Sequence, residues 1–168
     1  MEPYLCGMSS PIIPELKKKA AEKQKEHAAF LQKHGKKIPT KALYSAHDEV
    51  FAKIDCLECA NCCKQLGPRF RTPDITRIAK KMRMRESDFI EKYLRVDEDG
   101  DYVANVLPCP FLGADNYCHI YEDRPGDCRK YPYTDSDVFF KRPKTTLANA
   151  AYCPAVFTAL EILKKIEK

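Results

Sequence analysis

The stretch Cys56-Leu57-Glu58-Cys59-Ala60-Asn61-Cys62-Cys63 places four cysteines in eight residues, with the spacing C-x2-C-x2-C-C. A C-x2-C turn points two sulfur atoms at one centre, and a third cysteine at the same spacing adds a third sulfur. A tetrahedral zinc site or an iron–sulfur cube needs four, so a distant cysteine has to supply the last one. Neighbouring side chains point in different directions. The pair Cys62-Cys63 therefore predicts either one cysteine that is not a ligand or a junction between two metal sites.

Four more cysteines follow singly along the next ninety residues: Cys109, Cys118, Cys128 and Cys153. Together with the first four they divide into two sets of four, which favours two centres. We predict that Cys56, Cys59 and Cys62 share one centre with one remote cysteine. Cys63 would then join the other three remote cysteines. Disulfides, or a nucleophilic cysteine with His119 as its base, are the alternatives to metal.

The residues around the remote cysteines indicate which metal they bind. Proline follows both Cys109 and Cys153, as it follows the distant ligand in bacterial ferredoxins. This favours an iron–sulfur cluster, 4Fe–4S in particular, with zinc as the alternative. Arg124 and Arg129 flank the remote cysteines, and we expect them to support a cofactor by charge and hydrogen bonding to anionic sulfur. Surface salt bridges are the other interpretation of these two arginines. Cys6, alone near the start, is expected to be a surface thiol.

Composition and charge bound the class of protein. The chain has 168 residues, 44% hydrophobic and 32% charged, which suits one modest domain with a short appendage. Residues 1–42 carry nine Lys and four Glu, which accounts for the whole net charge of +5 and argues against a general nucleic-acid surface. No apolar run approaches the roughly 20 residues that span a bilayer, and no secretory signal is visible. We therefore expect a cytoplasmic protein without a membrane partner.

The chain begins with a basic segment. Pro14 suits the first position of a helix, lysines surround a thin apolar stripe, and Gly35 fits a C-terminal stop. His27 and His34 are expected to be surface histidines. We expect residues 1–40 to form a basic helical extension and residues 41–168 the cysteine-cluster domain. A second helix over 41–55 would lead directly into the cysteine cluster.

The remaining patterns predict a mainly α-helical fold, with a small α+β arrangement as the alternative. Helices are expected from Thr72 and from Ser87, and a β-hairpin over residues 96–103. Residues 133–147 look irregular or weakly β. An amphipathic helix follows Cys153-Pro154 and is expected to bury Ile166. In this interpretation, short helices and one hairpin surround an irregular cysteine-rich core.

Five motifs together resemble the zinc- or iron-chelating cysteine-cluster family, also called CxxCxxCC or YkgJ-like. They are C-x2-C-x2-C-C (56–63), C-P-F-L (109–112), C-x-I-Y (118–121), R-P-x-x-C-R-x-Y-P (124–132) and C-P (153–154). The resemblance covers residues from about 43 to 165 and departs from the family at none of the cysteines. It implies that the eight cysteines chelate metal. One relative in this family is a lysine N-methylase linked to an iron–sulfur centre.

The sequence therefore predicts a metal-binding protein with an electron-transfer or redox accessory role. It does not identify the redox or protein partner, and the question of an enzyme stays open. The enzyme alternative is iron–sulfur-dependent methyl transfer or oxidoreduction, although no Gly-rich nucleotide loop is present. The structural alternative is a zinc-stabilised interaction module that uses the basic helix.

Overall fold

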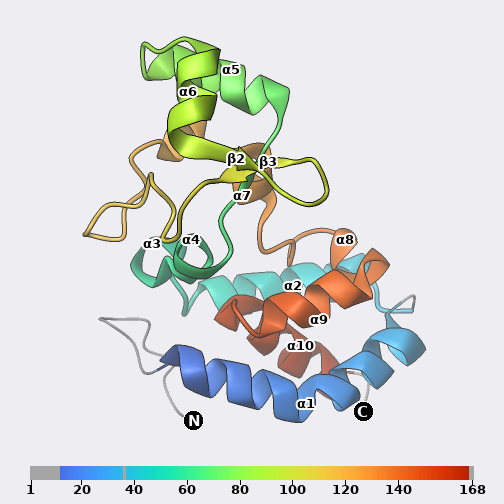
Figure 1. The fold of residues 1–168 in the computed structure, drawn as a ribbon. Helices are drawn as coiled ribbons and strands as arrows, with labels where there is room; N and C mark the ends of the chain where they lie inside the picture. The colour runs from blue at the N-terminus through green and yellow to red at the C-terminus, as the bar shows by residue number, and fades with distance from the viewer. Residues whose placement is uncertain (1–11, 36, 167–168) are drawn as a thin grey trace. The chain divides into compact units, whose positions relative to one another are not determined.

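The computed structural model describes residues 12–35 and 37–166, and its fold is mainly α-helical with one small antiparallel sheet (Figure 1), as predicted. Contacts divide the chain into two compact units. We call Met1–Cys59 with Pro132–Lys168 the split unit, and Ala60–Tyr131 the inserted unit. The division at residue 40 that the sequence suggests is a different one and stays a prediction. Cys6 lies outside the described residues.

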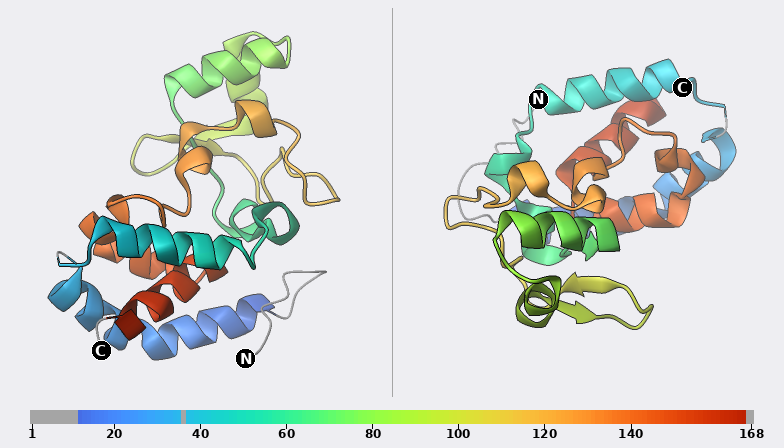
Figure 2. Two further views of the ribbon diagram at one scale, coloured as in Figure 1. Left: turned by 180° about the vertical axis from the view of Figure 1, so that it is seen from behind. Right: turned by 90° about the horizontal axis from the view of Figure 1, so that it is seen from above.

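The split unit is built from helices (Figure 2): α1 Ile12–His34, α2 Thr40–Phe51, α3 Cys56–Cys59, α8 Val138–Lys141, α9 Pro143–Ala150 and α10 Pro154–Ile166. The last of these, α10, packs against α1, α2 and α9, and its apolar face explains why: Val156, Ala159, Leu160 and Leu163 are all fully buried. The opposing face of α2 contributes Leu43, Ala46 and Val50, as the helical periodicity predicts. The prediction for Ile166 was wrong, because this side chain is 56% exposed.

Helix α1 packs against α9 and α10 along its predicted stripe, where Leu16, Ala20 and Leu31 are buried. Gly35 ends the helix as predicted: a Cβ atom there would lie 2.5 Å from the carbonyl oxygen of Leu31. The prediction that His27 is a surface histidine was wrong. Its ring is 1% exposed, and Nε2 lies 2.6 Å from a carboxylate oxygen of Glu161 on α10.

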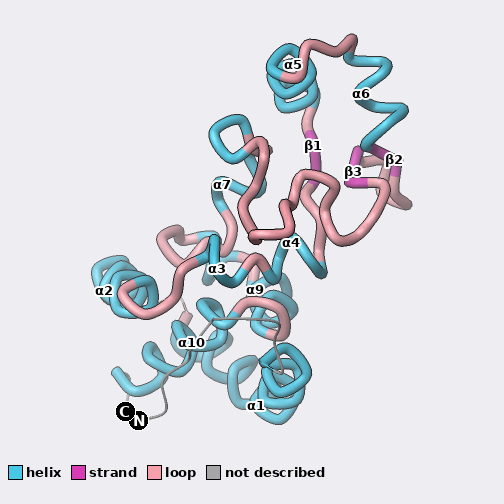
Figure 3. The backbone as a smooth tube through the Cα atoms, turned by 90° about the vertical axis from the view of Figure 1, so that its left-hand side faces the viewer, coloured by secondary structure: helices cyan, strands magenta, loops and turns pink. Residues whose placement is uncertain are grey.

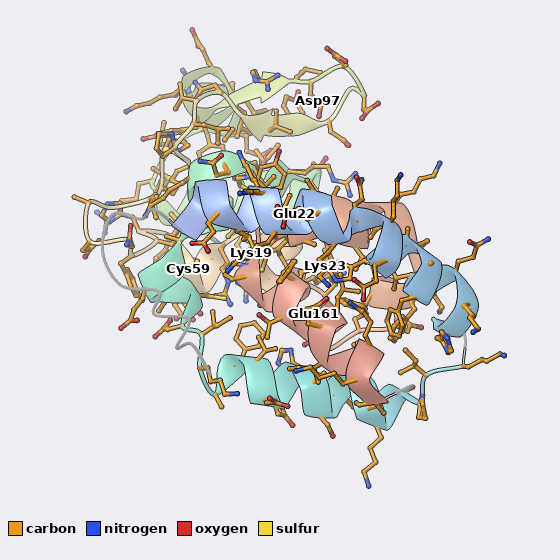
Figure 4. The ribbon with its side chains drawn as sticks, turned by 90° about the horizontal axis from the view of Figure 1, so that it is seen from below. Lys19, Glu22, Lys23, Cys59, Asp97 and Glu161 are labelled. Atoms are coloured by element: carbon orange, nitrogen blue, oxygen red, sulfur yellow. The ribbon has the colours of Figure 1, made fainter. Side chains whose placement is uncertain are left out.

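A charged network joins α1 to α10 around this histidine. Lys164 lies 2.6 Å from Glu26 and 2.7 Å from Glu161. Figure 4 shows Glu161 beside Lys23 of α1, whose amino group bonds Glu26 at 2.9 Å. Burial lowers the pKa of His27 in spite of Glu161, so the neutral ring is the stable form in the folded protein.

The expectation of an irregular or weakly β segment at residues 133–147 was wrong, because α8 and most of α9 lie there. Phe139 is 1% exposed and anchors α8. The hydroxyl of Thr146 donates to the carbonyl oxygen of Phe139 at 2.6 Å, and Pro143 occupies the first turn of α9. No described helix combines the length and the apolar character that crossing a bilayer requires. Helices α9 and α10, which meet at a sharp bend, have the required length and apolar character only when they are counted as one segment.

The inserted unit is built around a three-stranded sheet (Figure 3). Its elements are α4 Asn61–Gln65, β1 Arg69–Phe70, α5 Thr72–Lys81, α6 Glu86–Tyr93, β2 Leu94–Val96, β3 Tyr102–Ala104, the 3₁₀ turn η1 Tyr121–Asp123 and α7 Gly126–Lys130. The order is β1-β3-β2, with both pairs antiparallel. The predicted hairpin is therefore confirmed as β2 and β3, and the Asp97 carboxylate accepts the backbone N–H groups of Asp99 and Asp101 in its turn.

An aromatic core beneath the sheet holds the cysteine-bearing loops of the inserted unit. Phe70 and Phe89 are fully buried, and both rings pack against Phe111 at centroid distances of 6.0 and 5.9 Å. Phe111 lies two residues after Cys109, which is itself part of this core. The sulfur-bearing loop is thus fixed by the burial of a large aromatic ring beside it.

Candidate metal centre

The eight-residue cysteine stretch folds as two short helices rather than as one loop. Cys56 and Cys59 lie one turn apart on α3, and Cys62 and Cys63 lie on α4. Ala60 separates the helices, with a left-handed φ of 46° and a side chain that is 3% exposed. The predicted helix over residues 41–55 is shorter than expected: α2 ends at Phe51, and α3 begins separately, where the Asp55 carboxylate accepts the N–H of Leu57 at 2.7 Å.

The inserted unit brings together one group of four cysteines. We call it the four-cysteine group; its members are Cys63, Cys109, Cys118 and Cys128. The N–H of Cys109 donates to the carbonyl oxygen of Cys63 at 2.8 Å, and a β-bridge joins Leu112 to Cys118. Cys63 and Cys118 pack against the same aromatic core as Cys109.

The fourth member, Cys128, lies on α7, and its sulfur feels the charges of all three others. Burial raises the pKa of Cys128 most, and the charges of Cys63, Cys109 and Cys118 raise it further. The four sulfurs are therefore electrostatically coupled to one another. That Cys63 shares a metal centre with these three remote cysteines stays a prediction.

Three thiols of this group, those of Cys109, Cys118 and Cys128, are protonated at neutral pH because their pKa values are raised. Burial raises the pKa of Cys109 to about 11 and also raises that of Cys118. Backbone N–H groups oppose this: Phe111 donates to the sulfur of Cys109, and Ile120 to that of Cys118. A backbone N–H group that points at the sulfur of the residue two positions earlier stabilises the thiolate form of that residue. Metal-ligating sulfurs in proteins are stabilised by hydrogen bonds of the same kind.

Cys62 lies next to the four-cysteine group. Its sulfur is 4.0 Å from that of Cys63, and the hydrogen bond between them lowers the pKa of Cys63 to about 7 against the effect of burial. Two thiolates on one zinc ion are separated by about 3.8 Å. The sulfurs of Cys62 and Cys63 thus lie much closer together than expected for two neighbouring side chains that point in different directions. That Cys62 shares a centre with Cys56 and Cys59 stays a prediction.

The split unit brings a second set of cysteines together: Cys56, Cys59 and Cys153, which we call the three-cysteine group. Cys153 is 8% exposed and directly precedes α10. Burial raises the pKa of Cys153 to about 12, and the charges of Cys56 and Cys59 add to the rise. The N–H groups of Val156 and Ala155, in the first turn of α10, donate to its sulfur. The helix end therefore offsets part of the effect of burial, while the net shift keeps the thiol of Cys153 protonated at neutral pH.

The donor chemistry of both groups fits a thiophilic metal, but the side chains are not yet arranged around one. No disulfide joins any of the eight described cysteines. Among the described residues, no three His, Cys, Asp or Glu side chains already converge on a point that could hold an ion. A change of one χ1 rotamer moves a cysteine sulfur by about 3 Å. Side-chain rotation and loss of the thiol protons would therefore have to precede metal binding by either group.

The two predicted supporting arginines have different surroundings. Arg124 stacks on the ring of Tyr121 at 3.8 Å, and its charge acts to lower the pKa of both Cys118 and Cys128. Its place beside two sulfurs fits the predicted role. The guanidinium of Arg129 instead donates to the backbone carbonyls of Glu122 and Arg124. Among the described cysteines whose pKa is shifted, none owes any part of the shift to Arg129.

Comparison with known families gives one match. Residues 55–154 match the family CxxCxxCC, described as "Putative zinc- or iron-chelating domain". This range contains all eight described cysteines together with Arg124 and Arg129. No curated protein and no solved structure matches the chain.

Proposed function

The chain belongs to the CxxCxxCC family of zinc- or iron-chelating domains, and on that basis we propose that it holds metal in two cysteine groups and uses it in electron transfer or another redox accessory role. The four-cysteine group would hold one centre, and the three-cysteine group would supply ligands to another. Bound as an iron–sulfur cluster, the metal would supply a one-electron couple.

The observation that carries this proposal is the packing of Cys63, Cys109 and Cys118 on one aromatic core, with the N–H of Cys109 bonded to the carbonyl oxygen of Cys63 at 2.8 Å. Four thiols on separate segments influence one another's ionisation although each is at least half-buried. Burying thiols near one another costs stability when they ionise, unless a cation neutralises them. A divalent metal or an iron–sulfur cluster provides that compensation.

The chain's own residues would then tune the centre. The aromatic core excludes water from one side of the four-cysteine group, and the N–H groups of Phe111 and Ile120 stabilise negative sulfur. Arg124 adds a positive charge next to Cys118 and Cys128. Burial, hydrogen bonds to sulfur and nearby charge are the features that set the potential of a cysteine-ligated cluster.

The test is to purify the protein without oxygen, record its visible spectrum, and measure iron, zinc and acid-labile sulfide per chain. We expect a brown protein with iron and sulfide in similar amounts. A colourless protein with stoichiometric zinc would contradict the redox role and leave a zinc-stabilised module. A protein with neither metal would contradict the proposal as a whole.

A further inference from the structure

Two residues outside the cysteine motifs hold the segment that carries Cys128 in the inserted unit. Asp74 and Arg77 lie one turn apart on α5, and their side chains pair at 2.8 Å. The Asp74 side chain is 8% exposed, so the carboxylate is a buried charge that needs partners. In the sequence, Asp74 comes two residues after Thr72, in the first turn of the helix expected there.

The bonds of this pair lead to the loop before α7. Asp74 Oδ1 accepts the N–H of Gly126 at 3.1 Å. Gly126 is the first residue of α7 and lies two residues before Cys128. Arg77 Nη2 donates to the carbonyl oxygens of Asp123 at 3.2 Å and Arg124 at 3.1 Å. The pair thus satisfies three backbone groups on residues 123–126, a segment that includes Arg124 and ends two residues before Cys128.

We propose that Asp74 and Arg77 are positioning residues for the four-cysteine group, and that they fix Cys128 and Arg124 for metal binding. The inference rests on the proposed metal site. Residues that orient metal ligands through hydrogen bonds commonly change metal affinity by about 10- to 100-fold when replaced. Helix α7 has a second attachment, since Asp127 accepts from Arg69 Nε at 3.1 Å and from Arg71 Nη2 at 3.4 Å, so loss of the Arg77 bonds should loosen the loop before α7 without releasing the helix.

Arg77→Met is the primary test variant, because it keeps the aliphatic stem and the helix propensity of α5 but removes the donors to the loop. Arg85→Met is the matched control: Arg85 bonds Asp88 at 2.9 Å through both Nε and Nη2, on an exposed surface of the same unit. Asp74→Asn, similar in shape and without charge, is the second variant if Arg77→Met does not fold. Far-UV circular dichroism of each metal-free protein checks the fold.

The readout is the rate at which zinc, added alone to the metal-free protein, transfers to a chromophoric chelator. We expect Arg77→Met to release zinc about 10- to 100-fold faster than wild type, with Arg85→Met within about twofold of it. Arg77→Lys should recover part of the difference, because it restores a charge beside Asp74. Equal rates for Arg77→Met and Arg85→Met would overturn the inference alone. A wild-type protein that holds neither zinc nor iron would overturn the proposed function as well.

Discussion

Metal binding by the four-cysteine group should depend steeply on pH, because most of its thiols must lose a proton first. The raised pKa values of Cys109, Cys118 and Cys128 keep these three protonated at pH 7. Cys63, with a pKa of about 7, is half ionised there. Since metal ligands are thiolates, binding one ion at pH 7 should release between three and four protons.

The size of the effect follows from this count. Each proton released makes the apparent affinity change about tenfold per pH unit, and acid favours the metal-free form because protons compete with the metal. From pH 7.5 to pH 6.5 the apparent affinity should therefore fall by about 10³- to 10⁴-fold. Cys128→Ser removes one of the protonated thiols, so its slope should be lower by about one proton.

The assay is competition for zinc against a chelator of known proton affinity, in steps of half a pH unit between 6.0 and 7.5. A Cys56→Ser background weakens the three-cysteine group at an exposed position, so that the four-cysteine group dominates the titration. A slope of one proton or less would refute the reasoning. It would mean that these thiols are not the ligands, or that they are already ionised in the folded protein.

Three further predictions concern the two units. Cys63→Ser and Cys153→Ser should each remove about half of the metal measured per chain, because each disables a different group. Leu160→Ala should lower the free energy of unfolding by about 2–5 kcal/mol in urea titrations, whereas Ile166→Ala should change it by less than about 0.5 kcal/mol. Below pH 6.5 the melting temperature should fall, since the unfolded chain binds a proton at His27 that the folded chain resists.

Each of these has an outcome that would count against it. Complete metal loss in both serine variants would argue for a single shared centre. Equal destabilisation at positions 160 and 166 would contradict the burial of one and the exposure of the other. His27→Gln removes the titrating ring, so a variant with an unchanged pH profile would place the pH dependence elsewhere, and Glu161 would be the next residue to examine.

Regular patterns in the sequence predicted the elements whose signal is local. The apolar face of α10 repeats every three to four residues, and the acidic turn between β2 and β3 is a short-range signal. These features depend on residue type and spacing, which the sequence contains in full.

The features that were missed depend on partners far along the chain. His27 looks like a polar residue on a basic helix until Glu161, 134 residues later, pairs with it. Helix α8 has four residues, too few to show a period, and is held by the burial of Phe139. Asp74 and Arg77 reach backbone groups 46 to 52 residues away, and no side-chain motif marks a bond to a carbonyl or an N–H group.

The division into a split and an inserted unit has a consequence for how the protein is made. The inserted unit is continuous in sequence, so its four-cysteine group is complete once Tyr131 has left the ribosome. The split unit waits for Pro132–Lys168, which includes Cys153 and α10. The cysteines of the four-cysteine group are thus all synthesised before Cys153, on which the three-cysteine group depends.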